Sequence, residues 1–365
     1  MKYRYRNLIV IFLLLITINA IPSALGKNRR AYLTSFILNN EIIREGFSNA
    51  IYSDDTVSFE ATAYALEILD DYGINPHEIE ALQNNLENNV DEMFDNDEVV
   101  LYDLFFLMKS LNILQHETDI DLENRIYKYL NDTEQIGGGF SFKNSTSSAN
   151  LASTYYVIQL YLLIDETINN LTAHKNWILS CNNSDGGYGG SQGLSSTLTD
   201  TFFVVSLLDE LWGIDVLVDM NKTLHYLKSF FVDDSADLNS FGGYLPDEIA
   251  QYALLSSTFF CVKSISLIDP DLSELNSAST MAWVLARQYF EDGGFAENSE
   301  GYEQKTSSVI SSYYGFETLR VFNALSSLAG EIWMVEFNFW ILGIVLMSIG
   351  IIIALIVFLW RKRRI

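Results

Sequence analysis

Five pairs of adjacent aromatic residues recur along the sequence, and their rings are well suited to hold an apolar molecule. Neighbouring residues on an α-helix point about 100° apart, so one ring of a pair can face a cavity while the other packs between helices. We therefore expect Tyr155, Phe202, Phe259 and Tyr313 to line a cavity for an apolar chain. Any single ring could instead be an ordinary core residue. The pairs are Phe105-Phe106, Tyr155-Tyr156, Phe202-Phe203, Phe259-Phe260 and Tyr313-Tyr314.

These aromatic pairs belong to a longer repeat. The steps between them are 50, 47, 57 and 54 residues, and four of the five pairs follow directly after Thr or Ser. An earlier and weaker unit carries Thr62 and Tyr64, which makes six units. A glycine-rich turn ending in an aromatic residue precedes most pairs, as in Asp-Gly-Gly-Tyr at 185–188 and Asp-Gly-Gly-Phe at 292–295, but the second unit has none. Self-similarity at this period is typical of stacked supersecondary units.

Each unit offers two helical stretches. The chain has only four prolines, and no stretch alternates apolar and polar residues as a strand would. The second stretch of a unit, such as Thr154–Ile164, is apolar nearly all round, which indicates a helix buried on all sides. The first, such as 174–179, is more amphipathic. Six outer–inner helix pairs predict an all-α fold closed as an (α/α)6 toroid, and an open superhelix is the structural alternative.

At two places the repeat resembles that of a known family. Residues 177–190, and residues 283–288 followed by 292–295, resemble the repeat of protein prenyltransferase β subunits, whose superfamily also contains the terpenoid cyclases. The resemblance covers roughly residues 30–325 and implies the toroid fold. It also implies an isoprenoid or other apolar ligand. Arg287 matches the Arg-Gln step of the repeat and is our candidate contact for a ligand's diphosphate, with a surface ion pair as the alternative.

The resemblance would imply a zinc ion, but this sequence lacks the ligands. Family prenyltransferases use an Asp-x-Cys just before an inner-helix tyrosine, together with a later His. The corresponding residues here, 199–201, 256–258 and 310–312, contain no Asp-x-Cys, and Cys181 and Cys261 lie elsewhere. The four histidines all fall on outer segments or connections: His77, His116, His174 and His225. We therefore expect no zinc and no other cofactor, and we assign no catalytic residue.

The terpenoid cyclases instead use an Asp-rich motif whose acid protonates a polyene. Ser53-Asp54-Asp55-Thr56 lies too far before Thr62 and lacks the first Asp, so we interpret it as a helix cap or a solvated turn. Whether the chain is an enzyme therefore stays open. Our first hypothesis is a non-catalytic binding module for an apolar ligand or a protein partner. The alternative is a prenyl or isoprenoid transferase, or a cyclase-like enzyme, with a divergent active site.

Charge excludes one large class of partner. The net charge is −25, and all 47 acidic residues lie between Lys27 and Glu336. A nucleic-acid surface needs basic patches that neutralise phosphates, so we expect no nucleic-acid partner. Five Asn-x-Ser/Thr sequences predict a glycoprotein, and they begin at Asn131, Asn144, Asn170, Asn182 and Asn221.

The two ends of the chain predict its location. Residues 1–26 have the basic start, apolar centre and small final residues of a secretory signal peptide, with an uncleaved anchor as the alternative. The toroid is expected over 27–330. Residues 337–360 contain a long uncharged apolar run, which predicts a transmembrane helix, and the basic residues of 361–365 predict a cytoplasmic tail. We therefore expect a single-pass protein of the cell membrane with its N-terminal domain outside.

Overall fold

The computed structural model of the chain describes residues 27–50, 56–143 and 148–332. Its contacts separate two units: the described residues of the first are 27–29 and 330–332, and the second spans residues 30–329. In the first unit the two-residue strands β1 (Lys27–Asn28) and β6 (Glu331–Ile332) pair antiparallel. Residues 30–329, termed the toroid unit below, hold the predicted repeats.

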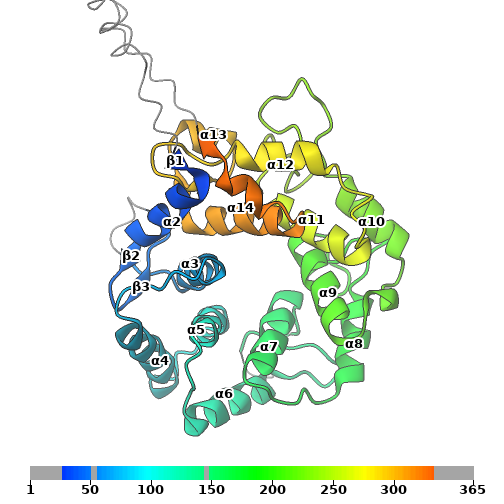
Figure 1. The fold of residues 1–365 in the computed structure, drawn as a ribbon. Helices are drawn as coiled ribbons and strands as arrows, with labels where there is room; N and C mark the ends of the chain where they lie inside the picture. Colours follow the sequence, from blue (N-terminus) through cyan, green and yellow to red (C-terminus); the bar gives the residue numbers. More distant parts are fainter. Residues whose placement is uncertain (1–26, 51–55, 144–147, 333–365) are drawn as a thin grey trace, which may run out of the picture. The chain divides into compact units, whose positions relative to one another are not determined.

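The toroid unit consists of helices in two concentric sets, and Figure 1 shows the inner set surrounded by the outer one. The inner helices are α3 (Phe59–Asp71), α5 (Leu101–Ile113), α7 (Leu151–Leu163), α9 (Leu198–Leu211), α11 (Leu255–Ile268) and α14 (Val309–Val321). The outer helices are α2 (Arg29–Asn39), α4 (Ile79–Asp95), α6 (Ile120–Thr133), α8 (Leu171–Ser180), α10 (Met220–Lys228) and α12 (Ser277–Leu285). Short elements connect them: α13 (Ser299–Glu303), the 3-10 turns η1 (Ile214–Val216) and η2 (Leu325–Ala329), and strands β2 (Glu41–Ile42), β3 (Gly46–Phe47), β4 (Phe295–Ala296) and β5 (Ser307–Ser308).

The distribution of apolar residues explains which helices lie inside. Helix α6 buries Leu122, Ile126, Leu130 and Thr133, a single stripe at the spacing of an amphipathic helix. Helix α14 buries residues on every side, among them Gly315 and Phe316 in direct succession. A helix that is apolar all round is stable only when neighbouring helices cover it. Helices of this kind therefore form the inner layer, and amphipathic helices form the outer one.

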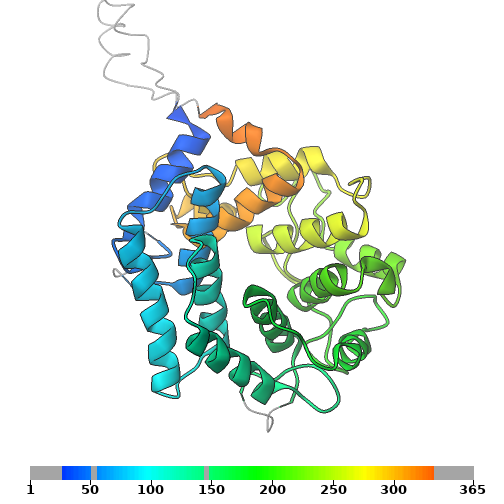
Figure 2. The ribbon, with the colours of Figure 1, turned by 60° about the horizontal axis from the view of Figure 1, so that its bottom comes forward.

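The inner helices form a closed ring. Each one contacts the next in chain order, and α14 contacts α3 to complete the circle. Figure 2 shows the same circle from another side. At the seam the backbone amide of Val309 donates to the carbonyl of Asn49 at 2.7 Å. The predicted toroid is therefore confirmed, and the open superhelix is excluded.

One hydrogen bond explains the repeated Thr or Ser. In five units the hydroxyl oxygen of this residue, inside the inner helix, accepts a bond from the backbone amide of the aromatic residue that ends the preceding turn. The amide–hydroxyl distances are 2.9 or 3.0 Å, and the pairs are Phe47–Thr62, Phe140–Thr154, Tyr188–Thr201, Tyr244–Thr258 and Phe295–Ser312. The second unit has Leu104 directly before its aromatic pair and makes no such bond.

Glycine is required in these turns for two reasons. Gly186 has φ +93°, and a Cβ atom added there would lie 2.3 Å from the backbone of Lys222 in α10, the outer helix of the next unit. The last turn repeats the arrangement, because a Cβ at Gly293 would lie 2.4 Å from the carbonyl oxygen of Tyr32 in α2. The outer layer thus closes across the same seam as the inner layer.

The predicted location in a membrane is corrected by the structure. Within 27–50, 56–143 and 148–332, no helix has the length and apolarity needed to span a bilayer. The longest helix of these described residues, α4, has 17 residues and carries several acidic side chains. This finding contradicts the prediction of a single-pass protein of the cell membrane. The segments 1–26, 337–360 and 361–365, as well as Asn144, lie outside the described residues.

Candidate functional site

The inner helices surround a cavity of about 280 Å³, termed the aromatic cavity below. All six inner helices contribute to its wall, and the predicted residues Tyr155, Phe202, Phe259 and Tyr313 all line it. The remaining lining residues are Glu60, Tyr64, Tyr102, Phe105, Phe106, Lys109, Tyr156, Thr199, Phe203, Phe260 and Tyr314. The structure therefore brings together the four aromatic residues that the sequence placed at one site.

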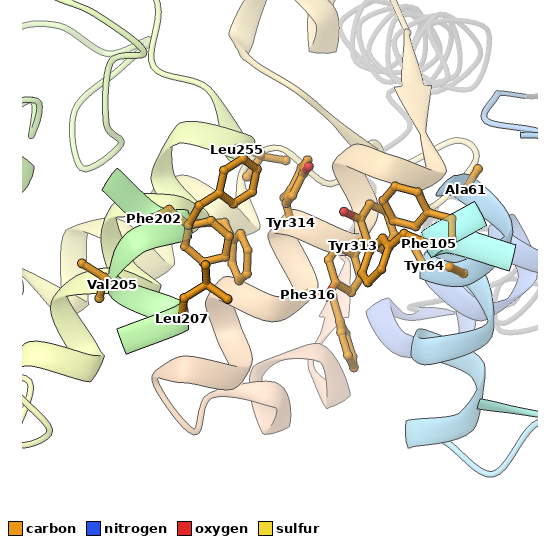
Figure 3. Close-up of a cluster of buried hydrophobic side chains, with 14 of the residues drawn as sticks. Ala61, Tyr64, Phe105, Phe202, Val205, Leu207, Leu255, Tyr313, Tyr314 and Phe316 are labelled. Carbon is orange, nitrogen blue, oxygen red and sulfur yellow. The ribbon is translucent and has the colours of Figure 1, made fainter. Parts of the chain in front are cut away.

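The rings form an unbroken circuit around the cavity. Tyr155 stacks on Phe203 with ring centroids 4.4 Å apart, and Phe202 stacks on Phe260 at 4.9 Å. The circuit crosses the seam between α14 and α3 where Tyr313 stacks on Tyr64 at 3.7 Å. Figure 3 shows Tyr64, Tyr313 and Phe105 grouped there. Such contacts hold the rings in fixed orientations, so the wall is preformed.

The orientation of the pairs differs from the sequence prediction. We expected one ring of each pair to face the cavity and the other to pack between helices, but both members of all five pairs line it. Two large rings about 100° apart on a helix can both reach the centre when the ring of helices is narrow. The second rings also touch the neighbouring helix, as Phe203 touches Tyr156 at 5.8 Å between centroids.

Glu60 is the residue of this site that sequence reasoning missed. It lies in the first turn of α3, two residues after the N-cap Ser58, where a carboxylate normally faces solvent and the helix N-terminus. Here it lines the aromatic cavity, close to Tyr102 and Tyr64. Burial raises the pKa of its carboxyl. The sequence did contain a signal for it: Glu60 lies four positions before Tyr64, and residues four apart lie on the same face of a helix.

The tyrosine hydroxyls of the cavity are neutral hydrogen-bonding groups. Burial raises the pKa of Tyr64, Tyr102, Tyr155 and Tyr313, in each case as the largest cause. The wall therefore combines apolar ring faces with a few uncharged donors. Sites with this composition hold apolar ligands and fix the orientation of a polar end.

A second pocket, of about 410 Å³, adjoins the aromatic cavity at the C-terminal ends of the inner helices and is termed the mouth pocket below. The two share Phe105, Lys109 and Tyr155. In the mouth pocket the Lys109 ammonium lies 2.7 Å from the Glu67 carboxylate. Its other polar lining includes Asp70, Asp71, Asn112, Gln159 and Arg320.

Arg320 binds the carboxylates at the edge of the mouth pocket. Its guanidinium lies 3.0 Å from Asp71, 3.0 Å from Glu317 and 3.7 Å from Glu67. Burial, and next the nearby charge of Glu67, raise the pKa of Glu317 to about 7. The mouth pocket therefore contains a network of ion pairs in which carboxylates outnumber the cations.

Arg287 does not lie at this site, contrary to our prediction. It follows α12, and its backbone carbonyl accepts a bond from Ala296, which fixes it in the turn between outer and inner helices. The side chain is buried against the ring of Trp283, at 5.2 Å, and burial lowers its pKa. The alternative of a surface ion pair is also wrong, because the side chain is not at the surface.

His174, Cys181 and Cys261, which were considered as zinc ligands, lie buried in the packing of the fold. The ring of His174 stacks on Phe140 at 4.4 Å, and its Nδ1 accepts a bond from the amide of Gly139. Cys181 and Cys261 are buried and free, and burial raises the pKa of both thiols. Across the described residues, no group of three His, Cys, Asp or Glu side chains could hold a metal ion.

Four of the predicted glycosylation sites lie on outer elements. Asn170 and Asn221 are exposed, at the N-cap of α8 and in the first turn of α10. Asn131 and Asn182 are partly buried, and their amides donate to the carbonyls of Tyr127 and Gly187. Their glycosylation stays a prediction.

Comparison with known families identifies the repeat. The model of the prenyltransferase alpha-alpha toroid domain matches residues 74–229, 170–248 and 238–334, together well over half of the chain. A search of curated proteins finds no match to the sequence.

Solved structures share the fold at low sequence identity. Protein geranylgeranyltransferase-I of Candida albicans, solved with GGPP, is 16% identical, with a TM-score of 0.61 over 78% of this chain and 90% of that one. A protein from Actinoplanes is 12% identical, with a TM-score of 0.54 over 83% and 99%. The type II terpene cyclase MstE from Scytonema is 10% identical, with a TM-score of 0.51 over 83% and 97%.

Proposed function

Since this chain belongs to the prenyltransferase alpha-alpha toroid domain family, we propose that it is a binding module for an apolar ligand and holds that ligand in the aromatic cavity. The observation that carries the proposal is the continuous wall of aromatic rings from all six inner helices around about 280 Å³. Enclosed apolar pockets with a few convergent polar groups are the usual sites of small-molecule binding.

The size of the cavity favours a short ligand. Ligand pockets usually measure roughly 300–1,000 Å³, so this one, at about 280 Å³, lies just below that range. Its rings are already in contact with one another, so binding requires little ordering of side chains. A chain of about ten carbon atoms, such as a C10 isoprenoid, suits such a volume.

Titration with geraniol, a C10 alcohol, tests the proposal. We expect saturable binding with one site per chain, followed by calorimetry or by the fluorescence of the aromatic residues. Thr199 is exposed in the first turn of α9 and lines the cavity, so a Thr199→Trp variant adds bulk there without disturbing the core. This variant should weaken geraniol binding at least about tenfold. A failure of geraniol to saturate, or unchanged affinity in the variant, would argue against the cavity as a binding site.

Glu60 favours a second candidate, an enzyme that acts on the bound ligand. Its carboxyl lies in the cavity with a raised pKa, as a general acid requires. In that case the carboxylic acid would transfer its proton to a carbon of a bound alkene, and a water molecule would add to the resulting carbocation. The proton lost by the added water would return to the Glu60 carboxylate, so that the net reaction is hydration of the alkene. Mass spectrometry of extracts after incubation with geraniol would detect the product. A product formed by the wild type and absent with Glu60→Gln would favour the enzyme over the binding module.

A further inference from the structure

The wall of the aromatic cavity carries two charged side chains, and only one of them is neutralised. Lys109 has its ammonium 2.7 Å from the Glu67 carboxylate, so its charge is balanced within the mouth pocket. Glu60 has Tyr102 and Tyr64 nearby, and the charge of Lys109 acts on it, but among the described residues no ion pair of Glu60 is found. Hydroxyls stabilise a carboxylate without balancing its charge. The aromatic cavity therefore has one acidic position without a cation in contact with it.

The mouth pocket, which adjoins the aromatic cavity, is acidic as well. Glu67, Asp70 and Asp71 line it, and Glu317 lies beside Arg320. The guanidinium of Arg320 is shared among three of these carboxylates, and Lys109 is paired with Glu67. An anionic ligand would have to displace these ion pairs before a cation became available to it. Desolvating an anion beside carboxylates is unfavourable, so this site is unsuited to a diphosphate.

An ammonium group already lies beside two rings of the cavity wall in this structure. The Lys109 ammonium lies 5.3 Å from the ring centroid of Tyr64 and 5.4 Å from that of Tyr313, within the distance of cation–π attraction. Glu60 shares the cavity wall with Tyr64 on its own helix, Tyr102 and Lys109 on α5, Tyr156 on α7 and Tyr314 on α14. Four ring systems beside a carboxylate are the ordinary elements of a receptor for an organic cation.

We propose that the ligand of the aromatic cavity is an apolar chain with a protonated amine as its head group, and that the ammonium binds Glu60 among the surrounding tyrosine rings. This inference rests on the proposed binding of an apolar ligand. The ammonium group supplies a positive charge next to Glu60 and is attracted by the tyrosine rings through cation–π interactions. An alcohol, in contrast, can form only neutral hydrogen bonds at this position, in place of those it made with water. A charge-assisted hydrogen bond is roughly twice as strong as a neutral one.

Three probes with one chain and different heads test the inference: geranylamine, geraniol and geranyl diphosphate. Calorimetry with the full chain at pH 7 should give the tightest binding for geranylamine, about ten- to a hundredfold tighter than geraniol. Geranyl diphosphate should bind most weakly. Glu60→Gln should remove the preference for the amine and keep the affinity for geraniol. The control Glu303→Gln changes an exposed carboxylate in α13 and should keep the full preference.

The outcomes separate the inference from the proposed function. Equal binding of geranylamine and geraniol, or tightest binding of geranyl diphosphate, overturns the amine assignment while the apolar cavity stands. An amine preference that persists in Glu60→Gln overturns the assignment to Glu60. Failure of all three probes to bind overturns the proposed function itself. If Glu60→Gln does not fold, the order of the three probes with the wild type still decides the question.

Discussion

The turns at the rim of the toroid and the cavity at its centre follow opposite rules. At the rim, five turns repeat the same amide–hydroxyl bond at nearly the same distance. At the centre, the six units contribute different rings, and burial raises the pKa of the carboxyls of Glu60 and Glu317. Satisfied hydrogen bonds stabilise a fold, while a buried carboxylate opposes it. The comparison indicates that the rim stabilises the ring and leaves the centre free to vary.

The second unit shows that an inner helix can keep its place in the ring without the glycine turn and the amide–hydroxyl bond. It lacks the glycine turn and has Leu104 in place of the Thr or Ser, yet α5 still contacts both α3 and α7. Leu104 and Leu107 are fully buried there. Burial of apolar side chains thus keeps this helix in the ring without the turn.

The largest effect is expected from a rim glycine. Gly186→Ala should lower the free energy of unfolding by about 3 kcal/mol, because the new Cβ would meet the backbone of Lys222 and φ is +93°. Gly137→Ala is the matched control, since a Cβ there meets nothing within 4 Å. Urea denaturation measures both. A similar loss in the two variants would show that the close approach to α10 does not matter.

At the centre, Glu317→Gln should change how stability depends on pH. The pKa of Glu317 in the folded protein is about 7, above its ordinary value of 4.5, so the folded state binds the proton more tightly. Its contribution is therefore fully present below about pH 4.5 and is lost as the pH rises to 7.

The stability difference between Glu317→Gln and the wild type should grow across this range by on the order of 2 kcal/mol in favour of the variant. Denaturation curves at several pH values measure it, with Glu303→Gln as an exposed control. A difference that stays constant with pH would show that the rise in the Glu317 pKa is absent.

A smaller effect is expected from the rim hydroxyl. Thr201→Val keeps the shape of the side chain but removes the acceptor for the Tyr188 amide and the donor to the Thr197 carbonyl. The loss of stability should be about 1–2 kcal/mol, because the buried amide is left without a partner. Thr199→Val, at an exposed position of the same helix, should change it by less than about 0.5 kcal/mol. Equal effects of the two substitutions would contradict the role given to this bond.

The fold was predictable because the rim repeats. Five of the six units use a glycine at positive φ and a hydroxyl for one amide, and both leave residues at similar spacing, such as Gly186 and Thr201. The aromatic pairs of four units were predictable for the same reason, since they follow the hydroxyl directly. The closing contact between α3 and α14 follows from the number of units.

The centre was less predictable because its chemistry is not repeated. Glu60 occurs in one unit alone, and an acidic residue in a first helical turn is normally a surface charge. The prediction for Arg287 was wrong because this residue is close to the repeat motif in sequence but not to the cavity in space. The turn that follows α12 holds its side chain against Trp283. The predicted membrane location rested on the chain ends and not on the repeat, and the described helices do not support it.

The seam between the first and last units has a consequence for how the protein is made. It joins Asn49 to Ile310, residues 261 positions apart, so it forms only after nearly the whole chain has left the ribosome. Until then, the apolar sides of α3 and α11 that α14 will cover stay open to other chains. Folding that depends on such distant contacts is slow, and the unfinished ring is prone to aggregate. A chain that ended before α14 would therefore associate with its copies through these two helices.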